Sequence, residues 1–398
     1  MTSDWKEYKI ADLGEIKTGK TPKTSIQENY GGNIPFLTPS DDMSVKYVKE
    51  TVKKITESGL KEVKSCLLSA GSICVSCIGS DLGKVVITTK PTVTNQQINS
   101  ILVDTEQFDT DFCYYLMVQL GKLLNYHSKT STAVPIINKT NFSSYGVHIP
   151  DLETQQKIAK VLSAIDDKIE LNNSINNNLE QQAQAIFKQI FSDISEDDLP
   201  SNWHKGTIGE IIELHDSKRV PLSGQQREKM KQKIYPYYGA TSLMDYVDDY
   251  IFDGIYLLLG EDGTVIDTKG FPILQYVWGK FWVNNHAHIL TGKNGFNVES
   301  LYLLFRQLSI KSIITGAVQA KISQTNLKSL EVIIPPIEVI ENLNDKIKPL
   351  FSQIRSNLDE NKVLTQLRDT LLPKLMNGEI DVSEVDISTD KLLFSEEK

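Results

Sequence analysis

The chain contains one pattern with an obvious chemical use, the phosphate-binding pattern G-x-x-x-x-G-K-[ST] at Gly14–Thr21. In a nucleotide-binding loop, backbone N–H groups hold the phosphates, and a helix that begins at the loop adds its positive end. Pro22 follows the pattern directly, and residues 23–32 have no apolar helical stripe. The sequence therefore predicts a polar loop here and not a nucleotide hydrolase. A nucleotide-binding assay of Lys20→Ala would distinguish the two.

Other residues of catalytic type are scattered. Cys74 and Cys77 have the spacing of a metal or redox pair, but the sequence has no second pair to complete a zinc site. They lie in the apolar run Ile73–Ile78, which indicates buried thiols in a strand. His286 and His288 are spaced as neighbours on a strand, and the six histidines form no ligand cluster. We expect no catalytic residue, no metal site and no cofactor on this chain.

The elements that would position any site follow from an internal repeat. Residues 137–191 and 322–376 align without a gap, and in each copy apolar residues recur every 3.5 positions, as in a coiled-coil seam. Both copies place asparagine at the same two adjacent seam positions. A buried seam asparagine costs stability and fixes the register. The sequence predicts two long helices of one design, with these seam asparagines: Asn172, Asn176, Asn357 and Asn361.

A two-fold axis between the copies requires the two helices to run antiparallel, with the globules at opposite ends. Full overlap of the seams sets Asn172 beside Asn361 and Asn176 beside Asn357. Arg368 then faces an aliphatic seam position, and we expect it to lift its charge toward solvent along its own stem. The seam of one helix spans about 50 Å at 1.5 Å per residue. This length exceeds one turn of a DNA duplex, which is about 35 Å.

The repeat extends into two globules. Trp5 matches Trp203, Ile34–Phe36 matches Tyr235–Tyr237, and Gly79–Lys84 loosely matches Gly260–Thr264. Short strand-like runs between glycine and proline turns, with a few amphipathic helices, predict an α+β (mixed) fold in both globules. We expect strands at 72–78, 85–88, 255–259 and 273–278, and helices at 112–124 and 298–308. The expected parts are a first globule at 1–150, a long helix at 151–195, a second globule at 196–336, a second long helix at 337–380 and an acidic tail at 381–398.

Charge is divided unevenly among these parts. The net charge of −9 arises in the two helical regions and the tail, because residues 151–200 carry −6 and residues 337–398 carry −5. Each globule carries +1 and can therefore present a basic face to phosphates. The sequence shows no secretion signal, and no apolar run approaches 18 residues. With four cysteines suited to a reducing compartment, we expect a cytoplasmic protein without a membrane segment.

Polar loops of both globules combine cations with side chains that could read DNA. Phosphate contacts position a protein on a duplex, whereas contacts to base edges specify the sequence. Any single residue here could equally belong to a solvated loop or cap a strand. Residues 1–150 contain no arginine, which removes the commonest guanine contact. The candidate DNA contacts are Lys17, Lys20, Thr21, Lys23, Gln96 and Gln97 in the first globule and Lys218, Arg219, Arg227, Lys229, Tyr238 and Thr241 in the second.

The duplicated plan and its motifs resemble the DNA specificity subunit of Type I restriction-modification systems. The resemblance covers nearly the whole chain. It departs from the plainest pattern at Asp216–Pro221, which replaces the Gly-Lys-Thr-Pro form of the first copy. The motifs that carry it are Trp5 with Gly19–Pro22, Ile34–Phe36, Ile149–Pro150 leading to Gln155–Ile158, and Leu371–Ile380.

The resemblance implies a non-catalytic subunit in which each globule is a target recognition domain for one half of a bipartite DNA site. The long helices would pair as a spacer and dock two methyltransferase subunits, which bind S-adenosylmethionine and modify adenine. Motor-nuclease subunits would join for restriction. The alternative is a free-standing bipartite DNA-binding protein without a methyltransferase partner, and co-purification with a methyltransferase would decide between them.

Overall fold

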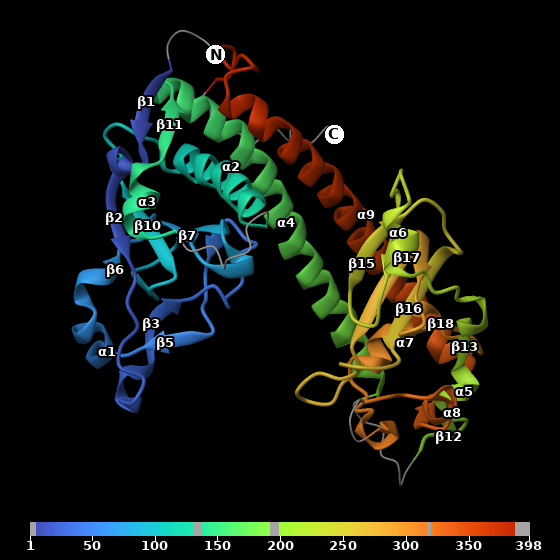
Figure 1. The fold of residues 1–398 in the computed structure, drawn as a ribbon. Coiled ribbons are helices and arrows are strands. Elements are labelled where there is room, and N and C mark those ends of the chain that lie inside the picture. The colour runs from blue at the N-terminus through green and yellow to red at the C-terminus, as the bar shows by residue number, and fades with distance from the viewer. Residues whose placement is uncertain (1–4, 130–136, 192–198, 317–319, 387–398) are drawn as a thin grey trace. The chain divides into compact units, whose positions relative to one another are not determined.

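The structure is a computed structural model that describes residues 5–129, 137–191, 199–316 and 320–386 (Figure 1). The chain divides into two compact units, one of residues 1–171 with 361–398 and one of residues 172–360. We call them unit 1 and unit 2. Each unit holds one globule and one half of each long helix, so the boundary between the units falls within the helices and not at their ends.

The globule of unit 1 has a five-stranded sheet in the order β2-β10-β7-β8-β4, a four-stranded sheet in the order β5-β3-β9-β6 and a two-stranded sheet of β1 and β11. Helix α2 packs on the first sheet, with its buried face in the same core as β7, β8 and β10. The elements are β1 (Lys6–Lys9), β2 (Gly14–Thr18), β3 (Tyr30–Leu37), β4 (Tyr47–Val48), β5 (Lys53–Ile55), α1 (Glu57–Glu62), β6 (Leu67–Leu68), β7 (Ile73–Ser76), β8 (Val85–Thr88), β9 (Thr92–Thr94), β10 (Ile98–Val103), α2 (Thr110–Lys129), α3 (Lys139–Ser144) and β11 (Gly146–Ile149).

The globule of unit 2 is built around one six-stranded sheet in the order β13-β18-β16-β17-β14-β15, with β12 and β19 as a separate pair. The elements are β12 (His204–Thr207), α5 (Ile208–Ile211), β13 (Ile212–Leu214), η5 (Asp216–Lys218), α6 (Gly224–Glu228), β14 (Tyr235–Tyr238), β15 (Leu243–Val247), β16 (Phe252–Gly260), β17 (Leu274–Val283), β18 (Ala287–Gly292), α7 (Val298–Phe305), α8 (Gln324–Lys328) and β19 (Glu331–Ile334). The mixed α/β content of both globules is as the sequence predicts.

The long helices are α4 (Leu152–Phe191) and α9 (Ile337–Met376), each of 40 residues. Glutamate lies in the first turn and lysine in the last turn of both, which suits the helix dipole. In unit 1 the first half of α4 shares a core with the last half of α9 through Ile158, Leu162, Leu372 and Leu375. In unit 2 the second half of α4 shares a core with the first half of α9. Within each unit the two helices therefore run antiparallel.

Two of the four seam asparagines meet in unit 2. Asn357 Nδ2 donates to Asn176 Oδ1 at 2.8 Å, the pair that the predicted register sets side by side. The predicted register requires every seam amide to hydrogen-bond to another seam amide, and not all of the remaining amide groups do so. Asn172 Nδ2 donates to Glu360 Oε2 at 2.8 Å, and Asn176 Nδ2 is buried without a hydrogen-bond partner among the described residues.

A tyrosine, a carboxylate and an arginine link the globule to the helices in each unit. In unit 1, Tyr115 on α2 donates to Asp166 on α4 at 2.6 Å, and Arg368 on α9 pairs with the same carboxylate at 2.8 Å. The prediction that Arg368 lifts its charge toward solvent is therefore wrong. Its guanidinium pairs instead with Asp166, which lies one position from the seam. In unit 2, Glu299 accepts from Tyr276 at 2.7 Å and from Arg355 at 2.9 Å.

Each globule starts and finishes with paired strands. β1 runs antiparallel to β11, with Lys6 opposite Ile149, and β12 runs antiparallel to β19, with His204 opposite Ile334 (Figure 1). The second strand of each pair is followed within a few residues by the long helix. The chain thus enters each globule beside the point at which it leaves.

Two expectations about cysteines and membranes can be compared with the structure. The four cysteines are buried as free thiols, and Cys74 lies within β7 as the sequence predicts. Burial raises the pKa of Cys74 to about 12. Among the helices that the structure describes, none has the length and apolar character needed to cross a membrane.

Candidate nucleic-acid interface

Several polar loops gather at one end of the main sheet in each globule. In unit 1, β2 ends, β10 begins and β7 ends on the same side, because Asn99 pairs with Thr18 and Ile98 with Ser76 in antiparallel register. The strands β13, β18 and β16 have the same arrangement in unit 2. We call this side the loop end. It comprises residues 18–22, 77–78 and 95–97 in unit 1 and residues 216–220, 261–262 and 284–286 in unit 2.

A set of hydrogen bonds fixes the loop end of unit 1. The backbone N–H of Cys77 donates to the Gln97 carbonyl at 2.8 Å, and the N–H of Ile137 donates to the Cys77 carbonyl at 3.0 Å. The Asn95 N–H donates to the Leu37 carbonyl at 3.1 Å, and Asn95 Oδ1 accepts from the Gln97 N–H at 3.1 Å. These bonds join four segments that are far apart in the sequence.

Unit 2 repeats this set bond for bond. Glu261 N–H donates to the His286 carbonyl at 2.8 Å, and Ile322 N–H donates to the Glu261 carbonyl at 2.8 Å. Asn284 N–H donates to the Tyr238 carbonyl at 3.0 Å, and Asn284 Oδ1 accepts from the His286 N–H at 2.8 Å. The two loop ends are therefore one design.

The matched bonds define which residues correspond. Gln97 corresponds to His286, and Cys77 corresponds to Glu261. The loose match of Gly79 with Gly260 in the sequence is wrong by three positions, because Cys77–Glu261 places Gly79 opposite Gly263. Both of these glycines have positive φ, +67° and +83°, a conformation that glycine adopts most readily.

Four of the first globule's candidates come together at its loop end. A Cβ on Gly19 would lie 2.2 Å from Thr94 Oγ1 and 2.3 Å from the Asn95 carbonyl, so glycine lets the two loops touch. Thr21 Oγ1 donates to Gln96 Oε1 at 2.7 Å, which joins these two candidates. Lys20 lies between Gly19 and Thr21 and is exposed. Gln97 is also at the loop end, where its Oε1 accepts from Asn95 Nδ2 at 2.9 Å.

The other two candidate lysines of this globule, Lys17 and Lys23, lie outside the loop end. Lys17 lies within β2, donates to the Leu67 carbonyl at 3.1 Å and keeps only 22% of its side chain exposed. Lys23 is exposed, and its backbone N–H donates to Glu62 at 2.9 Å, near α1. The phosphate-binding pattern itself is strand β2 followed by a loop, and the next element is a three-residue 3-10 turn at Gln27–Asn29. The helix that a nucleotide loop requires does not follow it in these described residues.

In the second globule, Lys218 and Arg219 have opposite environments. Lys218 is exposed. Arg219 keeps 13% of its side chain exposed and donates from Nη1 to Glu261 at 2.7 Å and to the Ala287 carbonyl at 2.8 Å. Its guanidinium is thus engaged inside the protein, and the expectation of a direct DNA contact gives way to a role in holding the loop end together.

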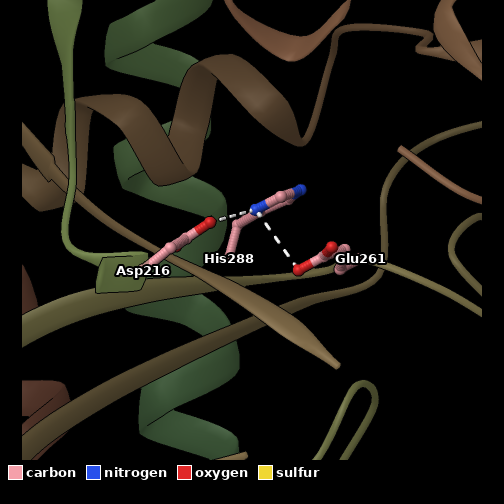
Figure 2. A group of neighbouring side chains, drawn as sticks. All are labelled: Asp216, Glu261 and His288. Carbon is pink, nitrogen blue, oxygen red and sulfur yellow. Dashed lines mark hydrogen bonds and ion pairs between the residues drawn. The ribbon is translucent and has the colours of Figure 1, made fainter. Parts of the chain in front are cut away.

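Arg219 pairs with two carboxylates of a buried charged network, whose residues Asp216, Glu261 and His288 are drawn in Figure 2. His288 Nδ1 lies 2.6 Å from Asp216 Oδ2 and 3.8 Å from Glu261, and its Nε2 lies 2.8 Å from the Ile322 carbonyl. Asp216 also accepts from the Ile289 N–H at 2.9 Å and from Gln324 at 2.7 Å. Burial opposes ionisation of Asp216, but hydrogen bonds from His288 and Ile289 outweigh it and lower the pKa of the carboxyl.

The same three side chains have ligand atoms within 4.8 Å of one another, the spacing of a metal site. The sequence predicts no such cluster, because the three residues are far apart along the chain. The carboxylates are already neutralised by protein cations, since Glu261 is bound by Arg219 and lies 3.5 Å from Lys321. Both nitrogens of His288 face oxygen acceptors, which an imidazolium satisfies. The arrangement is therefore an ion-pair network that ties the loops together.

The first globule has a neutral form of this network. Thr18 Oγ1 donates to Asn99 Oδ1 at 2.6 Å, and Asn99 Nδ2 donates to the Ile137 carbonyl at 3.3 Å. Thr18 and Asn99 hold the places of Asp216 and His288. The correspondence could have been found by aligning Gln97–Asn99 with His286–His288, a signal that the weak sequence similarity obscures.

The remaining candidates of unit 2 differ in exposure. Arg227 is turned inward, with Nη1 on the Leu222 carbonyl at 2.6 Å, Nε on Asp245 at 3.2 Å and its guanidinium 4.9 Å from the Tyr237 ring. As with Arg219, these bonds replace the expected DNA contact. Lys229 is exposed just after α6. Tyr238 is half-buried against Phe281, and Thr241 is exposed in the turn between β14 and β15.

The turn between β14 and β15, residues 239–242, also lies at the loop end of unit 2. Gln275 Nε2, at the start of β17, donates to the Gly239 carbonyl at 2.9 Å. A Cβ on Gly260 would lie 3.2 Å from the Ala240 carbonyl, so the turn also touches the end of β16. The candidates that share the loop ends are Lys20 and Gln96, which are exposed, and Thr21 and Gln97, which are half-buried, in unit 1, and the exposed Lys218 and Thr241 in unit 2.

Comparison with known proteins gives one family. The model of the Type I restriction modification DNA specificity domain matches residues 2–181 and 200–366. The MjaIX specificity subunit of a Type I restriction enzyme from Methanocaldococcus jannaschii is 27% identical, with 97% of this chain and 95% of that protein covered. The HindI specificity subunit from Haemophilus influenzae is 24% identical, with 95% of this chain and all of that protein covered (100%).

A solved structure has a similar fold. The crystal structure of the Type I restriction-modification S subunit from M. genitalium aligns with a TM-score of 0.58 at 18% identity, and the alignment covers 94% of this chain and 97% of that one.

Proposed function

Because the chain belongs to the family of the Type I restriction modification DNA specificity domain, we propose that its two loop ends are the surfaces that read the two halves of a bipartite DNA site. The chain is the specificity subunit of a Type I restriction-modification system and has no catalytic role of its own. It works in a complex with DNA, and adenine methylation and DNA cleavage belong to partner subunits.

The observation that carries the proposal is the bond-for-bond repetition of the loop end. A protein that reads two half-sites needs two surfaces of one architecture with different side chains displayed on them. The frame is the same in both globules, whereas the side chains on it differ: the half-buried Gln97 stands where the second globule has the exposed His286. The shared frame supports two independent readers.

Among the sequence candidates, the exposed cations suit phosphate, and the amides and hydroxyls at the loop ends suit base edges. Lys20 and Lys218 correspond and are both exposed, so we assign them to phosphates of the two half-sites. Lys23 and Lys229 would reach phosphates further along the duplex. Arg219 and Arg227 act as positioning residues. The proposed base-edge contacts are Thr21, Gln96, Gln97 and Thr241.

The partners in this proposal are two methyltransferase subunits that dock on the long helices and carry S-adenosylmethionine, with motor-nuclease subunits added for restriction. The helices offer a surface for docking within unit 1. Val363 and Leu367 lie one turn apart on α9 and are 63% and 45% exposed, and Leu171 on α4 is 51% exposed. Exposed apolar side chains spaced four apart lie on one helix face and suit an apolar partner.

The decisive experiment maps methylated adenines in a host that expresses the chain with its methyltransferase. We expect one bipartite sequence to be methylated. Exchanging residues 1–150 for the first globule of another family member should change one half of that sequence and leave the other half intact. If both halves change together, the two-reader proposal is wrong.

The same preparation tests the absence of catalysis. The isolated chain with labelled S-adenosylmethionine and DNA should transfer no methyl group, whereas the mixture with its partner should. Selective binding to the mapped site by the chain alone, with no partner that co-purifies, would favour the free-standing alternative.

The docking surface yields a separate prediction. Changing Leu367 to glutamate should weaken capture of the methyltransferase by at least about tenfold, because a charge would be buried against apolar partner groups. The measurement is the amount of partner retained on the tagged full-length chain. Gln366→Glu is the matched control, since it adds the same charge at the neighbouring exposed position. Equal loss in both variants would contradict docking on this face.

A further inference from the structure

His286 was not among the candidate DNA contacts, yet it lies at the loop end of unit 2. It lies one residue before β18, as Gln97 lies one residue before β10. Its side chain is 47% exposed. The neighbouring His288 is fully buried (0% exposed), so only His286 of the two histidines is accessible to a ligand from solvent.

Two neighbours fix the orientation of His286. Asn284 Oδ1 accepts its backbone N–H at 2.8 Å. Its ring Nδ1 lies 2.8 Å and 3.0 Å from the two carboxylate oxygens of Asp262. Because a carboxylate only accepts, Nδ1 carries a proton and donates it to Asp262. The ring Nε2 has no hydrogen-bond partner among the residues that the structure describes, so it is the atom that the oriented ring offers to a ligand.

The charges around His286 suit an anion. Asp262 faces one side of the ring, and Glu261, the next carboxylate, is neutralised by Arg219 at 2.7 Å and by Lys321 at 3.5 Å. Lys321 is 54% exposed, and Lys218 is exposed at the same loop end. His288 beneath is held by Asp216. The loop end around His286 thus carries exposed lysines, and the carboxylate beside the ring, Asp262, is already paired with it.

We propose that His286 donates a hydrogen bond from Nε2 to a DNA phosphate of the second half-site, as an imidazolium held between that phosphate and Asp262. The assignment rests on the proposed function, which makes the loop end the DNA-binding surface. Both acceptors require a proton on their ring nitrogen, so binding takes up one proton when the free ring is neutral.

Gln97 makes the corresponding position of the first globule insensitive to pH. Its Oε1 is taken by Asn95 Nδ2 at 2.9 Å, which leaves its amide N–H groups to donate. An amide donates without gaining a proton. The two half-sites therefore differ: contact at the second requires protonation near neutral pH, and contact at the first does not.

The test uses the full chain with its methyltransferase and a duplex that carries the mapped site. Affinity is measured between about pH 6 and pH 8, the range in which histidine changes charge. We expect wild-type affinity to fall about three- to tenfold as pH rises. His286→Gln, which imports the residue of the first globule, should abolish this pH dependence and weaken binding at about pH 6 by a similar factor. It should also lower the slope of log affinity against log salt by about 1 at that pH.

Matched variants separate the possible causes. Lys218→Ala should weaken binding but keep the pH dependence, because lysine stays charged over this range. Asp262→Asn should reduce the pH dependence, because the carboxylate that favours the doubly protonated ring is lost. His286→Gln should weaken binding to specific and non-specific duplexes alike, since a phosphate carries no sequence information. A loss confined to the specific duplex would overturn the phosphate assignment.

Failure of this inference can be told from failure of the proposed function. If wild type binds and directs methylation of its site while His286→Gln keeps the full pH dependence, the role of His286 is refuted and the function stands. If the wild-type complex binds no duplex selectively, the proposed function itself is refuted.

Discussion

Replacing Asp216 by alanine is expected to lower the free energy of unfolding of unit 2 by about 3–5 kcal/mol, the usual cost of removing one partner from a buried ion pair. The Asp216 side chain is 3% exposed and binds His288, Gln324 and the Ile289 N–H. Alanine would leave the His288 ring without its carboxylate. The buried donors that bind Asp216 could not regain water, so the loss of unfolding free energy should be large.

Urea unfolding of the full chain measures this effect. Three of the four tryptophans lie in unit 2, so fluorescence reports mainly on this unit. Thr18→Ala in unit 1 is the matched control and should cost about 1 kcal/mol, because it removes a single neutral hydrogen bond. Combining Asp216→Thr with His288→Asn rebuilds the neutral pair of unit 1 and should recover part of the loss. An unchanged midpoint for Asp216→Ala would contradict this account of the network.

The pH dependence of this stabilisation has a definite sign. The pKa of Asp216 is lowered in the folded protein, so its contribution is present above the unfolded value of about 4 and is lost as pH falls through the folded value. The part of the difference between wild type and Asp216→Ala that comes from the Asp216 charge should therefore shrink as pH falls below about 4.

The second large effect is expected at Asp166 in unit 1. Asp166→Ala should cost about 2–3 kcal/mol, because Tyr115 and Arg368 both lose their acceptor. The cost is below that of a fully buried pair, since Arg368 is 30% exposed and can regain water. Burial and the Asp166 charge raise the pKa of Tyr115, so the phenol stays protonated and would be left as a buried unpaired donor.

Hydrogen exchange of α2 and of the first half of α4 measures the loosening directly. Arg368→Ala and the double variant complete a mutant cycle with Asp166→Ala. If the two bonds to Asp166 act together, the double variant should cost clearly less than the two single costs added. Simple additivity would show that Asp166 and Arg368 do not interact across the helices. The control is Lys122→Ala, which removes an exposed pair with Asp369 without touching Arg368 and should cost less than about 1 kcal/mol.

The helices were the most predictable part of the fold because their signal is local and repeated. Apolar spacing of 3.5 over ten seam positions in two copies indicates a helix pair, and α4 and α9 are such helices. The predicted strand at Val85–Thr88 is confirmed in full. The seam shifts by one position near the second globule, where Phe187, 2% exposed, is buried in place of Ile186, and in unit 1, where Leu372, 1% exposed, is buried in place of Leu371. Phe187 stacks on Phe191, which meets Trp203 of the globule.

The loop ends were less predictable because they depend on contacts between distant segments. Residue type alone marks Arg219 and Arg227 as cations for phosphate. Their partners Glu261 and Asp245 lie 42 and 18 residues away, and no local pattern indicates that these carboxylates face them. The exposure of Lys20 and Lys218 could be predicted from the polar loops in which they lie, because it does not depend on a distant partner.

The paired strands at the boundary of each globule bear on how such chains diversify. β1 and β11, and likewise β12 and β19, bring the incoming and outgoing backbone to the spacing of adjacent strands, about 4.8 Å. An unrelated domain inserted at this point would need only two antiparallel strands in register to leave the following helix undisturbed. A recombination event that replaces everything between such strands can therefore give the subunit a new target in a single step, without any new adaptation in the enzymes that bind it.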